Sequence, residues 1–155
     1  MKHEVYGDLK RSPVMIEYTF KSVGTNGAIP IVVHFTETED PGIFDLAFGL
    51  ILNNGILNDV IRLNNGDRNK ILATVVAAIS KFTTEYPEKV IWFTGSSPDR
   101  ARLYRMIITL NLEELSKNFT ILGDLGQSKK DWEKFEKGRP YVGFAIKRKT
   151  NNLQI

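Results

Sequence analysis

The spacing of apolar residues changes near residue 67, and this change constrains the fold more than any single motif. Before it, residues 15–23, 28–36 and 43–49 are short alternating or apolar runs typical of β-strands. After it, residues 67–86 carry apolar side chains at helical spacing, which predicts an amphipathic helix ending before Pro87. The order indicates an antiparallel meander of three strands followed by a helix.

Turn-forming residues mark the borders of these elements. GTNG at residues 24–27 predicts a tight turn between the first two strands. Pro30 places the start of the second strand at an edge or a bulge, because proline lacks the backbone N–H. Residues 50–66 predict a turn and a short extended or helical piece; their two LNNG copies do not make a structural repeat.

The second half alternates between strand and helix. Ser97 and Pro98 supply the cap and first-turn residues of a second helix, which is expected to run to about Asn118. The other elements expected here are a strand at 88–95, a strand at 119–123, a loop or short helix around 131–137 and a strand at 140–149.

We therefore expect an α+β fold, in which helix-strand-helix and two further strands follow the meander and the helices pack on a mixed or antiparallel sheet. The 155 residues suit a single domain over 1–155, with loose termini at 1–12 and 150–155. Trp92 and Phe93 are expected in the core, and Trp132 with Phe135 on a helix face packed against the sheet.

Composition narrows the function classes. The chain has no cysteine and two histidines without paired spacing, so no metal site and no cofactor is expected. No catalytic or nucleotide-binding motif such as G-x-S-x-G or G-x-G-x-x-G occurs, and the sequence leaves open whether the chain is an enzyme. The first dozen residues lack a signal-peptide core and no apolar run is long enough to cross a membrane, so we expect a cytoplasmic protein.

The stretch GSSPDRARLYRMI at residues 95–107 holds the strongest candidate site. On a helical wheel Arg100 falls within the apolar face, in the first turn, where free amide groups already favour an anion. An anionic ligand such as a phosphate would neutralise this charge, and Ser96, Ser97 and Arg102 would also bind it. Alternatively, Arg100 pairs with an internal carboxylate such as Asp45, Asp59 or Asp67, and Ser97 only caps the helix.

A second candidate lies at NNGD, residues 64–67, before the first helix. Asn65 and Asp67 could present donors to an anion there, with Arg68 close by, or could serve only as a turn and a helix cap. If the strands before the two helices are neighbours, both helix starts open on the same edge of the sheet.

Several stretches resemble an uncharacterised family of bacterial proteins associated with Bacteroidetes. The likeness covers nearly the whole chain and is carried by FDLAFG, NNGDRNKILATV, YVGFAIKRK and above all GS-x-x-x-R-x-R-L-Y at Gly95–Tyr104. It implies an intact domain and no particular activity.

The element order also resembles the core of the acetyl-CoA-dependent N-acetyltransferases, which implies Tyr104 as a general acid. The paired-glycine pyrophosphate loop of that superfamily is not reproduced. The leading hypothesis is therefore a module that binds a phosphate-bearing or other anionic ligand, such as a nucleotide or a nucleic-acid backbone. One alternative is an acetyltransferase-like enzyme with a degenerate CoA loop. The other is a homo-oligomeric interaction module without catalysis, such as a homodimer, which uses an exposed strand edge or the aromatic segment around Trp132 and Phe135.

Overall fold

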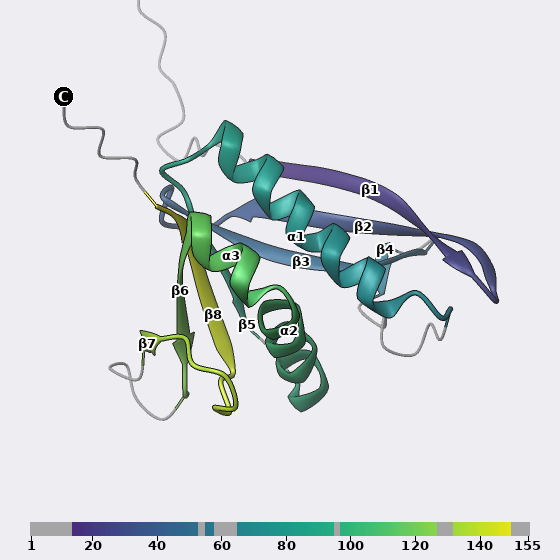
Figure 1. Ribbon diagram of the computed structural model, residues 1–155. Coiled ribbons are helices and arrows are strands. Elements are labelled where there is room, and N and C mark those ends of the chain that lie inside the picture. Colours follow the sequence, from purple (N-terminus) through teal and green to yellow (C-terminus); the bar gives the residue numbers. More distant parts are fainter. Residues whose placement is uncertain (1–13, 53–54, 58–64, 95–96, 127–131, 150–155) are drawn as a thin grey trace, which may run out of the picture.

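A computed structural model describes residues 14–52, 55–57, 65–94, 97–126 and 132–149 (Figure 1). The helices are α1 (Arg68–Glu85), α2 (Pro98–Leu110) and α3 (Leu112–Asn118). The strands are β1 (Met15–Gly24), β2 (Gly27–Glu37), β3 (Ile43–Leu52), β4 (Gly55–Leu57), β5 (Val90–Thr94), β6 (Phe119–Asp124), β7 (Trp132–Lys134) and β8 (Gly143–Arg148). The predicted loose termini lie outside the described residues.

The strands form one mixed sheet in the order β1-β2-β3-β5-β8-β6-β7, with β4 paired to β3. β1, β2 and β3 are the predicted antiparallel meander. β3 and β5 run parallel, and the other described pairs are antiparallel. The expectation of an α+β fold with a mixed sheet is confirmed.

The three described helices pack on the same face of the sheet (Figure 1). Phe82 of α1 stacks on Phe35 of β2, with ring centroids 4.3 Å apart. Tyr104 of α2 packs edge-on against Phe93 of β5 at 5.1 Å. The core therefore lies between the helices and the sheet, and the opposite face, which no described helix covers, is called here the open face.

Pro30 lies where the sequence predicts it can be tolerated. The β2–β3 pairing begins at Ile31, so the backbone nitrogen of Pro30 precedes the ladder that β2 forms with β3. A proline there removes no ladder hydrogen bond, because its nitrogen faces away from β1.

The second helix is shorter than predicted. It ends at Leu110, and α3 begins after Asn111. The Asn111 side-chain amide donates a hydrogen bond to the Ile107 carbonyl at 2.7 Å. Asparagine competes with the helical backbone for such carbonyls, which explains the break within the expected continuous helix.

Two expectations about tryptophan segments are wrong. Residues 132–134 form strand β7 rather than a loop or helix, because they pair with Leu122–Asp124 of β6. Trp92 lies on the open face and is 37% exposed, since the alternation of β5 turns Ile91 and Phe93 into the core instead. Trp92 contacts Trp132 there, with ring centroids 6.4 Å apart.

Among the described residues, no helix has both the length and the apolar character needed to cross a membrane.

Candidate functional site

A groove of about 470 Å³ lies beside α2 and is lined by four arginines from three separate elements. We call it the arginine groove. Its cationic residues are Arg68 of α1, Arg102 and Arg105 of α2, and Arg139 of the β7–β8 connection. The rest of its wall is formed by Asn69, Met106, Thr109, Leu110, Phe135, Gly138 and Pro140.

The start of α2 places two of these arginines. Ser97 caps the helix, because its side-chain oxygen accepts a hydrogen bond from the Arg100 backbone amide at 3.3 Å. Pro98 occupies the first turn, where no amide donor is needed. Arg102 and Arg105 follow three residues apart, a spacing that brings side chains together on one helical surface.

The start of α1 supplies the third arginine. The described strand immediately before α1 is β4, which pairs antiparallel with β3, whereas β5 is the strand before α2. Among the described strands β4 does not pair with β5, so the two strands before the helices are not neighbours. Arg68 in the first turn of α1 and Arg102 near the start of α2 nevertheless line the same groove.

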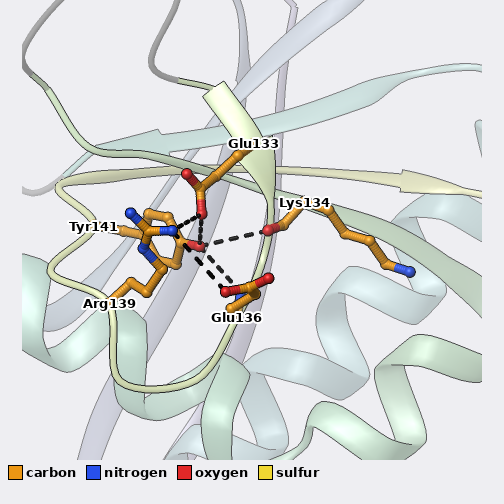
Figure 2. Close-up of polar contacts among 5 residues, drawn as sticks. All are labelled: Glu133, Lys134, Glu136, Arg139 and Tyr141. Carbon is orange, nitrogen blue, oxygen red and sulfur yellow. Dashed lines mark hydrogen bonds and ion pairs between the residues drawn. The ribbon is translucent and has the colours of Figure 1, made fainter.

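The β7–β8 connection supplies the fourth arginine and holds it in place (Figure 2). Arg139 pairs with the Glu133 carboxylate at 3.0 Å. The same carboxylate accepts a hydrogen bond from the hydroxyl of Tyr141 at 2.8 Å, and that hydroxyl also accepts one from the Glu136 amide at 3.0 Å. The Tyr141 side chain is fully buried, so this cluster fixes the loop against the core.

The charges of the groove are only partly neutralised. Arg105 donates a hydrogen bond to the backbone carbonyl of Tyr141 at 3.0 Å, which orients its guanidinium without cancelling its charge. Within the described part of the chain, Arg68 and Arg102 have no carboxylate partner, whereas Arg139 has Glu133 and, at 4.0 Å, Glu136. The groove is therefore a local concentration of positive charge on a chain whose net charge is only +3.

The structure divides the residues of the first predicted site. Arg102 lines the arginine groove, while Arg100 is half-buried nearby and is absent from the groove wall. Ser97 caps α2, and Ser96 lies outside the described residues. Of the carboxylates considered for Arg100, Asp45 lies on the open face, opposite the helices.

Asn65 and Asp67 hold the β1–β2 hairpin against the start of α1. The buried Asn65 amide donates to the Ser22 hydroxyl at 2.9 Å and to the Gly27 carbonyl at 3.1 Å. The Ser22 hydroxyl lies 2.7 Å and 2.8 Å from the two Asp67 carboxylate oxygens. Both side chains are thus engaged in a structural network and do not line the arginine groove.

The sequence predicts the anion site at the strand-to-helix turn Gly95–Arg105, which includes Arg105 without giving it a binding role, and it does not point to Arg139. Arg105 carried a usable signal, because it follows Arg102 at helical spacing. Arg139 carried none, since only the tertiary fold brings the β7–β8 connection against α2.

Tyr104, the general acid implied by the acetyltransferase resemblance, is 5% exposed and packs between Phe48 and Phe93. Burial raises the pKa of Tyr104, while the nearby Arg100 partly offsets this rise. Tyr104 does not line the arginine groove. No group of three or more histidine, aspartate or glutamate side chains that could hold a metal ion occurs among the described residues.

A family model covers nearly all of the chain, matching residues 2–149, and its description is a family of unknown function, DUF6934. The chain belongs to this family. The match spans all the described elements and assigns them no activity. Neither the curated proteins nor the solved structures gave a match.

Proposed function

We propose that this DUF6934 member binds a small anionic ligand, carrying phosphate or carboxylate groups, in the arginine groove. The observation that carries the proposal is the convergence of four arginines from α1, α2 and the β7–β8 connection on one hollow. Arginine is suited to this role because its planar fork of donors matches carboxylate and phosphate oxygens.

The charge balance supports an anion rather than a neutral ligand. Arg68, Arg102 and Arg105 bring three guanidinium groups that no described carboxylate neutralises. Keeping like charges close together is unfavourable unless an anion or solvent screens them, so an anion that binds here relieves repulsion as well as gaining hydrogen bonds. The volume of the groove lies within the range of about 300–1,000 Å³ that is usual for small-molecule sites.

The apolar part of the wall supports a ligand with more than its charged groups. Met106, Leu110, Phe135 and Pro140 lie in the same hollow as the arginines. Such a mixture of a few polar groups with apolar side chains is typical of ligand sites, where the polar groups orient the ligand and apolar contact adds affinity.

Isothermal titration calorimetry with pyrophosphate and with citrate, at low ionic strength, tests the proposal. We expect the unmodified chain to bind. In Arg102→Gln and in Arg68→Gln the dissociation constant should rise about tenfold or more, because each variant loses one charged contact. Lys81→Gln is the matched control, since Lys81 is an exposed cation of α1 outside the groove. Absence of binding of both anions, or equal loss in Lys81→Gln, would refute the proposal.

A further inference from the structure

The outer edge of β1 is the part of the sheet best suited to pair with a strand of another molecule. β1 ends the strand order, and among the described residues only β2 pairs with it. Its 10 residues exceed the usual strand length of about five or six. Native proteins block such an edge with a proline, a bulge or charged side chains. Residues 15–24 contain no proline and pair with β2 in unbroken register, and their charged residues, Glu17 and Lys21, are of opposite sign.

The hydrogen-bonding pattern shows which backbone groups face outward. The Val14 carbonyl accepts a hydrogen bond from the Glu37 amide at 2.8 Å, so even-numbered residues of this strand direct their backbone groups toward β2. In an antiparallel ladder the alternate residues direct theirs away from that neighbour. The outward-facing residues are therefore Met15, Glu17, Thr19, Lys21 and Val23.

The side chains of β1 follow the same alternation. Ile16, Tyr18 and Phe20 pack against the core, so the odd-numbered residues place their side chains on the open face. Two of these are large, apolar and exposed: Met15 is 51% exposed and Val23 is 66% exposed.

We propose that a second copy of this chain pairs with β1 in antiparallel orientation, with a two-fold axis at Thr19. On the open face, the residues Met15, Glu17, Thr19, Lys21 and Val23 are complementary to themselves about Thr19. Glu17 then lies opposite Lys21 of the second copy, and Lys21 opposite its Glu17. The same register places Met15 opposite Val23 and sets the two copies of Thr19 against each other.

Every one of these pairs is of a kind that stabilises neighbouring strands. Opposite charges, threonine pairs and apolar or aromatic pairs directly across a ladder each contribute to sheet stability. On the core side of the sheet the register sets Tyr18 opposite Phe20 of the second copy, twice by symmetry. Both are only partly buried in the single chain, so each has aromatic surface left to cover.

The proposed interface gives a closed dimer and not an open filament, because a two-fold interface uses the same surface of both copies. The product is a dimer with one continuous sheet, in which the helical layers of both copies lie on the same face. Glu17 is already oriented on the open face, where His34 of β2 lies 3.0 Å from one of its carboxylate oxygens.

A charge-swap series measured by sedimentation velocity tests this pairing. We expect the unmodified chain to form dimers across micromolar concentrations. Glu17→Lys and Lys21→Glu should each raise the dissociation constant about tenfold or more, because each sets two like-charged pairs across the axis. The double variant restores opposite charges and should recover most of the lost affinity.

Thr19→Pro provides a second test that leaves the charges alone. The Thr19 amide faces outward, so proline there removes no β1–β2 hydrogen bond but blocks the central pair of the dimer. Thr19→Val, which keeps the amide, is the control and should remain dimeric. Circular dichroism melting of each variant separates loss of pairing from loss of folding. A chain that is monomeric at all concentrations, a dimer unaffected by Thr19→Pro, or a double variant no tighter than the single ones would overturn the proposal.

Discussion

The Arg105 guanidinium donates a hydrogen bond to the backbone carbonyl of Tyr141, 36 residues further along the chain, at 3.0 Å. This contact joins the middle of α2 to Tyr141, which lies two residues before β8. The side chain of that same tyrosine reaches the Glu133 carboxylate, which pairs with Arg139 (Figure 2). One wall of the arginine groove is therefore set by a chain of polar contacts that begins on the helix.

Removing Arg105 should destabilise the fold, whereas removing Arg102 should not. Arg105→Ala leaves the part-buried Tyr141 carbonyl without its donor, so we expect the free energy of unfolding to fall by about 1–3 kcal/mol. Arg102 is exposed and bonds to no described residue, so Arg102→Ala should change stability by no more than about 0.5 kcal/mol. Urea unfolding followed by circular dichroism measures both; equal effects would show that the Arg105 contact contributes nothing specific.

Gly24 should be intolerant of a side chain. A Cβ at this position would overlap the backbone carbonyl oxygen of Asn65, which accepts a hydrogen bond from the Thr25 amide. Gly24→Ala must therefore separate the β1–β2 hairpin from the start of α1, at a cost of about 2 kcal/mol or more. The control is Gly42→Ala, whose nearest neighbour is the flexible, exposed Asp40 side chain at 3.3 Å. Thermal denaturation compares the two, and a similar melting temperature for both variants would contradict the prediction.

Arg148 should contribute to stability from β8. Its guanidinium donates to the Thr83 hydroxyl at 3.1 Å and to the Ser80 carbonyl at 3.2 Å, and it lies 4.9 Å from the centre of the Phe119 ring. Arg148→Ala removes these links between β8 and α1, so we expect a loss of about 1.5–3 kcal/mol in the free energy of unfolding.

The neighbouring Lys147 is the control for Arg148. It is exposed and lies on the open face, so Lys147→Ala should change the free energy of unfolding by no more than about 0.5 kcal/mol. Urea titrations of the two variants side by side measure the difference. If Lys147→Ala is as destabilising as Arg148→Ala, loss of charge rather than loss of these contacts is the cause.

Tyr141 should make the fold sensitive to alkaline pH. Burial, reinforced by the hydrogen bond to the Glu133 carboxylate, raises the pKa of the Tyr141 phenol above its usual value. A raised folded-state pKa favours the protonated form, so this stabilisation is complete below the unfolded pKa of about 10 and is lost as pH rises through the folded pKa. We expect the free energy of unfolding to fall above about pH 10.

Tyr141→Phe isolates this contribution. The variant loses the hydroxyl contacts and should be less stable at neutral pH by about 1–2 kcal/mol. It should also lose stability less steeply above about pH 10, because one of the titrating phenols is gone. Urea midpoints across the alkaline range measure both effects. Parallel pH dependences of the variant and the unmodified chain would show that Tyr141 does not titrate on unfolding.

Local patterns were sufficient for most of the elements. The alternation in 15–23 and the spacing from Ile71 to Phe82 fixed strand and helix because each pattern is a property of neighbouring residues. These patterns failed where pairing with another segment of the chain determined the secondary structure. β7 is a strand only because β6 lies beside it. Trp92 likewise faces outward because the register of β5 turns Ile91 and Phe93 toward the helices.

The sequence by itself determined the α+β class, the meander, the principal helix and the presence of arginines at the start of α2. The tertiary structure alone decided which arginines meet, since Arg68, Arg105 and Arg139 are far apart along the chain. It also decided that Asn65 and Asp67 are occupied by Ser22. The physical reason is the range of the interactions. Periodicity and capping act within a few residues, whereas the groove depends on how α1, α2 and the β7–β8 connection pack together and on the Arg105–Tyr141 contact.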